Sequence, residues 1–326
     1  MDNHLTNIEI KNFKCFKDFK ADGFKRVNLI GGNNNVGKTA FMEACYLGIS
    51  TRSDAHKFFN SLLVVELSRN QFMEFEIIKD TNNFEFKYDN SELKINDELC
   101  HFNNSVKRPF GKATKGLYTK PSKDYHNGID EIMQFYRGSS EPLDIKNTTF
   151  ISMNGIRDNY LADCIDDIKL SNKWDIINKQ LEEIFNIKKI DVIKNTVMLE
   201  YESEYLKLYE FGDGLKHFIS ILISINLNKD SIIFLDEVDN GIHYTNFDEL
   251  WEIILKISKK QEVQVFATTH SKECIDSFAR VSKKLEDEDI SYVKITKLDD
   301  NNVMAGVRNY DMIQDSIEDN HELRGW

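Results

Sequence analysis

The chain has 326 residues, of which 41% are hydrophobic and 11% aromatic, so it can bury the core of one large domain or of two. Its net charge of -12 at pH 7 counts against a broad surface that coats nucleic acid, although a local basic patch stays compatible with it. The longest apolar run, 218–225, is too short to span a bilayer, and the N-terminus lacks the pattern of a signal peptide. Five scattered cysteines without a C-x-x-C pair favour reduced thiols over a disulfide framework or a zinc site. We therefore expect a cytoplasmic protein that does not contact a membrane.

The first hundred residues predict two strand-rich segments separated by helix. Alternating apolar and polar residues indicate strands, and apolar residues at helical spacing indicate helices. The predicted elements are one or two strands over 5–20, a short apolar strand over 26–30, helices over 38–49 and 54–66, and an antiparallel meander over 71–95.

Residues 96–146 differ in character, because they contain all three prolines of the chain. We interpret them as an insertion in the core fold rather than a separate domain. Within them, residues 105–125 combine basic and aromatic side chains: Lys107, Arg108, Lys112, Lys115, Lys120 and Lys123 with Phe110, Tyr118 and Tyr125. This pattern could bind DNA phosphates and stack on bases. A solvated loop or a partner contact is the favoured interpretation, since basic runs are often only solvated.

The rest of the chain alternates buried strands with helices. In order, the predictions are a strand over 148–153, helical structure over 158–187, two strands around 190–193 and 197–208, a helix over 215–227, a strand over 231–236, a helix over 248–257, a strand over 263–271, a helix over 273–285, a hairpin of 290–298 with 303–310, and a last short helix before a polar tail. The segment 231–236 is an apolar run that ends in an acid, and 263–271 is a second such strand that ends in polar residues. This profile is typical of strands buried on both faces of a parallel sheet. The fold class is therefore α/β.

A phosphate-binding loop is the strongest motif. Gly32-x-x-x-x-Gly37-Lys38-Thr39 lies between the strand 26–30 and the helix 38–49, the context that this pattern requires. Backbone N–H groups and the helix N-terminus would bind ATP phosphates, Lys38 would contact the β- and γ-phosphates, and Thr39 would ligate Mg²⁺. The predicted nucleotide-binding residues of the loop are Gly32, Asn33, Asn34, Asn35, Val36, Gly37, Lys38, Thr39 and Ala40. The alternative is a glycine-rich turn that binds nothing.

Two strands that follow carry the other groups needed for nucleotide hydrolysis. Asp236 and Glu237 end one buried strand, and His270 ends the next. Ligands in open α/β sheets lie at this carboxyl edge. We predict that Asp236 helps to hold Mg²⁺, that Glu237 is the general base, and that His270 contacts the γ-phosphate or holds the attacking water. A lone histidine is more often structural, but this one follows a strand expected beside Asp236.

The motifs together resemble the ABC-type ATPases of the SMC, RecF and OLD (overcoming lysogenization defect) groups, and most closely small bacterial AAA-family proteins with an OLD-like ATPase. The shared segments are Ile8-Glu-Ile-Lys-Asn-Phe-Lys-Cys-Phe16, the phosphate loop, Leu235-Asp-Glu-Val-Asp-Asn-Gly-Ile-His243, Ala267-Thr-Thr-His-Ser271 and Glu322-Leu-Arg324. The resemblance implies one ABC-type ATPase domain over 1–326, with a mixed or parallel core sheet, an N-terminal antiparallel β subdomain and a helical subdomain. It implies that 154–187 forms part of the helical subdomain, and that 188–326 forms a second ATPase lobe.

The resemblance also implies a head-to-head dimer that sandwiches ATP and Mg²⁺. Each phosphate loop would face the signature segment of the other head, which by position includes Gly212, Asp213 and Gly214. The family often has Ser where Gly212 stands, so contact with the γ-phosphate would depend on backbone N–H groups and on the following helix. Asn240–His243 would form the D-loop at the dimer seam, and Asn154 or Arg157 would provide the lid-loop residue.

Two functions follow as hypotheses. The preferred one is an ATP-binding, slowly hydrolysing head that controls a separately encoded nuclease or toxin in anti-phage defence, because neither a coiled-coil arm nor a Toprim nuclease domain is evident. The alternative is a RecF-like ATPase that acts directly on duplex DNA through 105–125. A nucleotide-locked scaffold without turnover is a third interpretation, which Glu237 and His270 argue against.

Overall fold

The computed structural model describes residues 4–50, 75–79, 84–89, 92–95, 98–99, 148–152, 155–156, 158–171, 173–299 and 302–318. Several predictions lie outside these residues, namely the helix 54–66, the basic segment 105–125, the lid-loop candidates Asn154 and Arg157, and the motif Glu322-Leu-Arg324.

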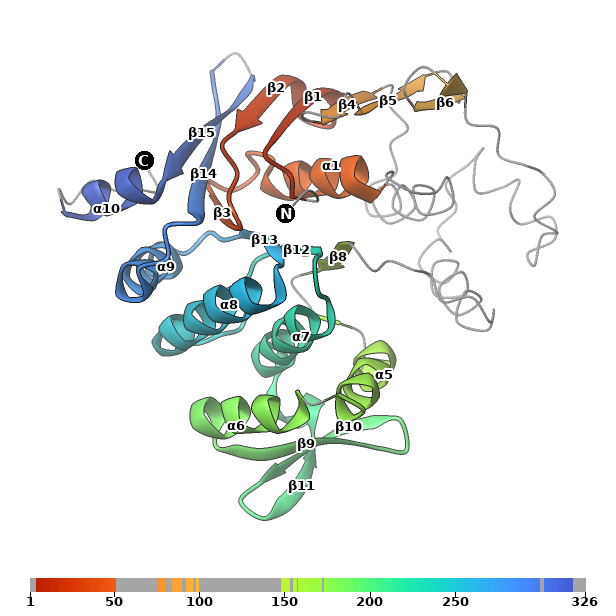
Figure 1. Ribbon diagram of the computed structural model, residues 1–326, viewed down its shortest axis with the longest axis vertical. Coiled ribbons are helices and arrows are strands. Elements are labelled where there is room, and N and C mark those ends of the chain that lie inside the picture. The colour runs from red at the N-terminus through yellow and green to blue at the C-terminus, as the bar shows by residue number, and fades with distance from the viewer. Residues whose placement is uncertain are drawn as a thin grey trace.

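A six-stranded mixed sheet forms the centre of the molecule (Figure 1). Its strands, in spatial order, are β15 (Val303–Asn309), β14 (Ile290–Lys297), β3 (Val27–Gly31), β13 (Gln264–Thr268), β12 (Ile232–Leu235) and β8 (Thr148–Ile151). The strands from β14 to β8 are parallel, and only the edge strand β15 runs antiparallel. The predicted α/β class with a mixed or parallel core sheet is confirmed.

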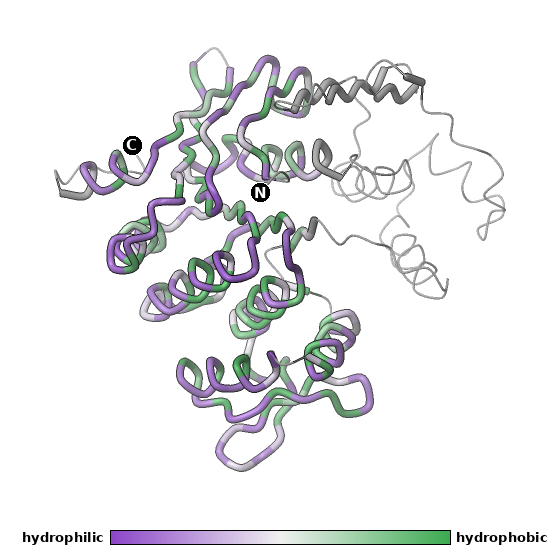
Figure 2. The backbone as a smooth tube through the Cα atoms, in the orientation of Figure 1, coloured by the Kyte–Doolittle hydropathy of each residue, from purple (hydrophilic) through white to green (hydrophobic). Residues whose placement is uncertain are grey.

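The central strands are buried on both faces, as their apolar runs predict. Along β12, the side chains of Ile233 and Leu235 belong to one core cluster, whereas Ile232 and Phe234 belong to the other. The same alternation occurs in β13, where Phe266 points to the opposite side from its neighbours. Figure 2 shows these strands and α7 (Asp213–Leu227) as largely hydrophobic. The sheet therefore separates two layers of core.

The upper layer contains α1 (Lys38–Ser50) and a second, antiparallel sheet (Figure 1). That sheet has the order β2 (Phe16–Asp22), β1 (Asn7–Phe13), β4 (Phe75–Lys79), β5 (Phe84–Asp89), β6 (Glu92–Ile95), β7 (Glu98–Leu99). The predicted strands over 5–20 and the meander are confirmed. The meander continues through β7 into the segment that we interpreted as an insertion.

The lower layer consists of three helices that cover the other face of the core sheet: α7, α8 (Phe247–Gln261) and α9 (Lys272–Leu285) (Figure 1). The Ser271 side chain caps α9 by accepting a hydrogen bond from the backbone N–H of Cys274, the expected role of serine before a helix. The described part of the chain ends with α10 (Tyr310–Glu318). Within the described part of the chain, every helix is too short or too polar to cross a membrane.

A small lobe lies below these helices, built from α5 (Asp158–Lys169), α6 (Trp174–Phe185), β9 (Ile187–Ile193), β10 (Thr196–Tyr201) and β11 (Glu204–Lys207) (Figure 1). The prediction of two strands here is wrong, because the segment 197–208 folds back on itself as β10 and β11. Glu202 and Ser203 form the turn with positive φ angles of 47° and 71°. Such two-residue turns normally carry Asn or Gly, so the residue types at these positions do not predict a turn.

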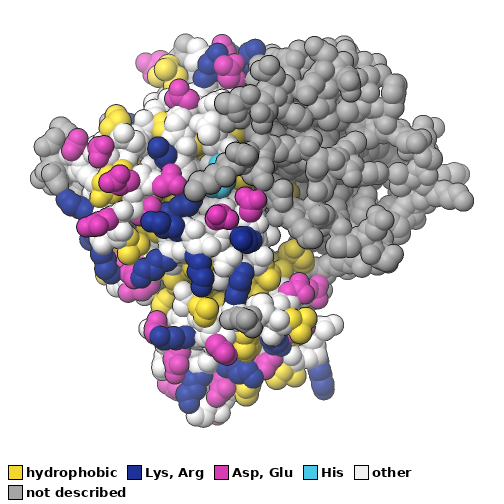
Figure 3. Space-filling view, in the orientation of Figure 1, with side chains coloured by type: hydrophobic (Ala, Val, Ile, Leu, Met, Phe, Trp, Pro, Cys, Tyr) yellow, Lys and Arg dark blue, Asp and Glu magenta, His cyan; other side chains and the backbone are white. Residues whose placement is uncertain are grey.

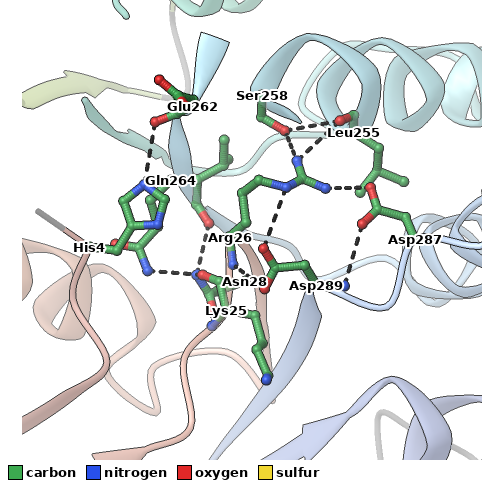
Figure 4. Close-up of polar contacts among 11 residues, drawn as sticks. His4, Lys25, Arg26, Asn28, Leu255, Ser258, Glu262, Gln264, Asp287 and Asp289 are labelled. Atoms are coloured by element: carbon green, nitrogen blue, oxygen red, sulfur yellow. Dashed lines mark hydrogen bonds and ion pairs between the residues drawn. The ribbon is translucent and has the colours of Figure 1, made fainter. Parts of the chain in front are cut away.

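A buried polar cluster at the amino edge of the core sheet connects β3 to the lower layer (Figure 4). The Arg26 guanidinium, 4% exposed, pairs with the Asp287 carboxylate and donates 3.1 Å to the carbonyl oxygen of Leu255. On the neighbouring strand, the Gln264 amide exchanges hydrogen bonds of 2.8 Å with both backbone groups of Leu5. These contacts fix the strands at the edge opposite the loops that carry the candidate site.

Candidate active site

Three neighbouring strands bring the predicted catalytic groups to one edge of the sheet. β13 lies between β3, which leads into the phosphate loop, and β12, which leads into Asp236 and Glu237. The backbone continues this order past the strands, since Thr269 N donates to Ile30 O at 3.1 Å and Val238 N donates to Thr268 O at 2.9 Å. His270 therefore stands between the phosphate loop and the two carboxylates.

The phosphate loop has a backbone that glycine alone can provide at two positions. Gly32 and Gly37 have φ angles of +145° and +105°, and Asn35 between them has +60°. A Cβ at Gly32 would fall 2.3 Å from the carbonyl oxygen of Ile295, and one at Gly37 would fall 2.5 Å from the Cys15 sulfur. The loop is thus held from outside by β14 and by the β1–β2 turn, with its asparagines exposed. This curled backbone fits a bound polyphosphate.

Lys38 is buried and its ammonium lies over the loop. Its Nζ donates to the carbonyl oxygens of Gly32 at 2.9 Å and Asn33 at 2.8 Å, and lies 3.1 Å from Nδ1 of His270. An ammonium group can only donate, so Nδ1 accepts and a neutral His270 ring carries its proton on Nε2. The phosphate loop therefore sets the tautomer of His270.

The Asp236 carboxylate accepts hydrogen bonds from two threonine hydroxyls. Thr39 Oγ1 lies 3.3 Å from Oδ1 of Asp236, and Thr268 Oγ1 donates to the same oxygen at 2.8 Å. Thr268 Oγ1 also accepts from the backbone N–H of Glu237 at 2.8 Å. One hydroxyl and one carboxylate facing each other suit Mg²⁺, which prefers few protein oxygens together with substrate phosphates. No cluster of three or more His, Cys, Asp or Glu side chains suited to a metal occurs among the described residues.

Glu237 has the properties expected of a base. Burial, followed by the charges of Asp236 and Asp239, raises the pKa of its carboxyl group, while Lys38 partly opposes this. Its Oε1 lies 3.7 Å from Nε2 of His270, and both side chains remain about a third exposed. A carboxylate with a raised pKa accepts a proton more readily, and partial exposure leaves room for a water molecule.

The predicted signature segment lies at the start of α7. Gly212 and Asp213 are exposed, and Gly212 occupies the N-cap position with φ +89° and ψ 169°, without a side-chain cap. Gly214 is buried directly against the predicted D-loop, because a Cβ at Gly214 would lie 1.8 Å from the carbonyl oxygen of Gly241. The structure therefore brings the signature and D-loop segments of one chain into backbone contact.

Sequence reasoning missed two residues at this site, Thr268 and Cys15, and it placed Gly241 in the D-loop without its contact to α7. Thr268 bridges the two carboxylate residues, Gly241 makes room for α7, and Cys15 packs on Gly37. The polar pair after the apolar part of strand 263–271 was a usable signal for Thr268, because a hydroxyl at the carboxyl edge faces the ligand side. The contacts of Gly241 and Cys15 join segments that are distant in the sequence, so the local residue pattern does not predict them.

Comparisons with known proteins agree with this geometry. Residues 27–276 match the family described as "AAA domain, putative AbiEii toxin, Type IV TA system". An ATP/GTP phosphatase of Helicobacter pylori is 25% identical over 342 residues, which cover 86% of this chain and 89% of that protein. The DNA replication and repair protein RecF of Nitrosococcus oceani is 43% identical over 44 residues, 14% of this chain and 12% of RecF.

Solved structures of SMC heads share the fold. An SMC head bound to the C-winged helix domain of ScpA has a TM-score of 0.53 at 12% identity, covering 94% of this chain and 99% of that one. An SMC head with an extended coiled coil, bound to the C-terminal domain of ScpA derived from Pyrococcus furiosus, has a TM-score of 0.51 at 13% identity, covering 97% and 99%.

Proposed function

We propose that this chain, which belongs to the AAA-domain family that it matches over residues 27–276, is an ATP-hydrolysing head that assembles on ATP and controls a separately encoded effector. The fold shared with SMC heads and the short RecF match support an ABC-type ATPase of the SMC/RecF group. The observation that carries the ATPase part is the line of contacts from Lys38 through His270 to Glu237 across three adjacent strands. The relative named ATP/GTP phosphatase supports the same activity.

Each residue has a distinct task in the proposed reaction. Lys38 would exchange its two loop carbonyls for the β- and γ-phosphate oxygens, and the loop N–H groups would hold the remaining phosphate charge. Glu237 would accept the proton of the attacking water, with the Nε2–H group of His270 directed at the same region. Mg²⁺, when bound, would neutralise charge on the transferred phosphoryl group, and Thr39 and Asp236 are the residues that would hold it.

Assembly on ATP is proposed from the exposed start of α7. A partner head could reach Gly212 and Asp213, where backbone N–H groups of a 15-residue helix have no side-chain cap. The shared fold with SMC heads supports this arrangement, which the resemblance to ABC-type ATPases first suggested. Asn240–His243 would then lie at the seam beside the signature segment, because Gly241 touches Gly214.

We propose further that this head controls an effector in anti-phage defence. The description of the matched family, with its toxin and its Type IV TA system, supports a role in a system of more than one protein. A protein recovered from the native host with Glu237→Gln in Mg²⁺–ATP, but not with Lys38→Ala, would identify the effector. Recovery of the same proteins with both variants would contradict nucleotide control.

A RecF-like role on DNA is the second candidate, favoured by the short RecF match. The proposed contact is the basic segment 105–125. Over the described part of the face in Figure 3, Lys and Arg alternate with Asp and Glu rather than forming one positive field. This role predicts that duplex DNA stimulates ATP hydrolysis at low salt, and that neutralising Lys112, Lys115 and Lys120 abolishes the stimulation. Equal rates with and without DNA would exclude it.

The decisive test combines binding, turnover and mass. Lys38→Ala should lose ATP binding, and Glu237→Gln should bind ATP but hydrolyse it about 100-fold more slowly or worse, the usual loss of a general base. Light scattering on Glu237→Gln should show a doubled mass in Mg²⁺–ATP. Hydrolysis at the wild-type rate by Glu237→Gln would refute the assigned base, and a monomer in both states would refute assembly on ATP alone.

A further inference from the structure

His217 is an ionisable side chain that is fully buried in the lower layer. It lies on α7, three residues after Gly214, and has 0% of its surface exposed. Neither ring nitrogen has a hydrogen-bond partner among the described residues. Buried polar groups are nearly always hydrogen-bonded, so an unsatisfied ring at this depth calls for an explanation.

The ring faces the turn that carries the proposed base. The backbone groups of Glu237 and Val238 lie near the ring and, against the larger effect of burial, raise its pKa, as carbonyl oxygens that accept from a ring N–H do. Neither contact has the geometry of a normal hydrogen bond. Burial lowers the pKa of His217 to about 4, so the ring is neutral at pH 7 and carries a single N–H. Movement of α7 towards the turn would allow this contact to become a hydrogen bond.

The same turn is held on its other side and is conformationally unusual. The backbone N–H of Glu237 donates to the Thr268 hydroxyl at 2.8 Å, and Glu237 itself has φ +51°, which non-glycine residues rarely adopt. The direction of the Glu237 carboxylate therefore depends on what fixes its backbone. Thr268 supports it from β13, and His217 is the group that faces it from α7.

Gly214 gives α7 a second contact with the segment that follows the base. Residues 214 and 217 lie on one face of the helix, since positions three apart are neighbours. Gly214 packs backbone to backbone on Gly241, four residues after Glu237. Hence one helix face, beginning at the signature segment, contacts the catalytic turn at Glu237 and the D-loop at Gly241.

We propose that His217 is a positioning residue: it connects the signature helix α7 to the backbone of Glu237 within the same chain, so that the placement of α7 sets the direction of the base. The proposal rests on the proposed function, because it assigns the base role to Glu237. The partner-facing end of α7 and the base would then move as one unit, with His217 as the link. Its effect falls on the rate of hydrolysis and spares the binding of ATP.

The test compares apolar and amide replacements of the ring. His217→Leu should lower kcat for ATP hydrolysis by about 10- to 100-fold, as small displacements of catalytic groups do, with KM for ATP unchanged. His217→Gln and His217→Asn keep an N–H near one ring nitrogen, and at least one of them should recover most of the lost kcat. Asn226→Leu, a buried polar residue near the far end of α7, is the matched control and should hydrolyse ATP like the wild type.

A second variant tests the helix contact independently of the ring, in case His217→Leu fails to fold. Gly241→Ala places a Cβ 2.8 Å from the Gly214 Cα at a φ of +71°, which forces α7 and the turn apart. It should reproduce the loss of kcat with KM unchanged. Gly306→Ala, where a Cβ meets nothing within 4 Å, is its control.

The outcomes separate this inference from the proposed function. Wild-type turnover in His217→Leu, together with loss of turnover in Glu237→Gln, would overturn the role of His217 alone. Loss of kcat in His217→Leu that neither amide variant restores, or that comes with weaker ATP binding, would reduce His217 to a packing residue and overturn the inference. Wild-type turnover in Glu237→Gln would overturn the assigned base, and the inference with it.

Discussion

Acidification from pH 7 to pH 5 should destabilise the protein through His217. The ring is fully buried, and its pKa falls from 6.5 to about 4 on folding, mainly because burial penalises the charged form. The unfolded chain therefore takes up this proton at a higher pH than the folded chain. Stability from this group is fully present above pH 6.5 and is lost as the pH falls from 6.5 towards 4.

The size of the effect follows from the shift. Each pKa unit corresponds to about 1.4 kcal/mol, and at pH 5 the unfolded ring is protonated whereas the folded ring is still mostly neutral. The free energy of unfolding should therefore be lower at pH 5 than at pH 7 by about 2 kcal/mol from His217. Glu237 contributes with the opposite sign, because burial and the neighbouring carboxylates raise its pKa on folding. Glu237→Gln removes this opposing contribution to the pH dependence of stability.

The assay is urea unfolding, followed by circular dichroism, of Glu237→Gln and of Glu237→Gln with His217→Leu. Each protein is measured at pH 7 and at pH 5, and its loss of stability over this range is compared with that of the other. All other titrating groups are common to the two proteins and cancel in the comparison. The protein that keeps His217 should lose about 2 kcal/mol more. Equal losses in the two proteins would show that the ring is not buried in its neutral form, and would refute the reasoning.

Three further predictions concern stability and turnover. Arg26→Met leaves the buried Asp287 carboxylate without its ion-pair partner and should lower the free energy of unfolding in urea by about 3–5 kcal/mol. Lys20→Met removes an exposed ion pair and should change this free energy by nothing measurable, so equal effects of the two substitutions would contradict the role of the buried pair. Thr268→Val removes the hydroxyl that contacts both Asp236 and Glu237, and should lower kcat about tenfold. It should also raise the Mg²⁺ concentration needed for half-maximal hydrolysis, and an unchanged Mg²⁺ dependence would argue against the role of this hydroxyl. Gly212→Ser forces a side chain into φ +89° and should lower stability by about 1–3 kcal/mol, so an unchanged urea midpoint would contradict the strain.

The sequence allowed the core sheet and the phosphate loop to be predicted because both depend on local patterns. The strand around Phe234 is apolar at every position, and the strand around Phe266 carries an apolar run before its polar end. Both patterns predict burial on two faces, and the two clusters of core residues bear this out. The loop motif spans only eight residues from Gly32 to Thr39. Its strand and helix begin within one residue of their predicted positions.

Other features depend on contacts that a single sequence does not reveal. The turn at Glu202 and Ser203 splits one predicted strand into two, and neither residue type signals a hairpin. The pairing of Thr268 with Asp236 needs the order of the strands, which places β13 between β3 and β12. The predicted roles of the site residues likewise stay predictions, although the geometry brings Lys38, His270 and Glu237 together.

The two glycines of the signature segment illustrate how a motif can be interpreted too narrowly. The family resemblance assigns Gly212 to contact with a nucleotide and treats it as a departure from Ser. In this chain its backbone angles, φ +89° and ψ 169°, belong to a region that glycine alone adopts readily. The conformation at the start of α7 therefore requires glycine at this position. Gly214 serves a separate purpose, because it allows α7 to lie against Gly241. A Ser at position 212 would restore a hydroxyl at the expense of that local conformation, while any side chain at 214 would separate α7 from the turn that holds Glu237.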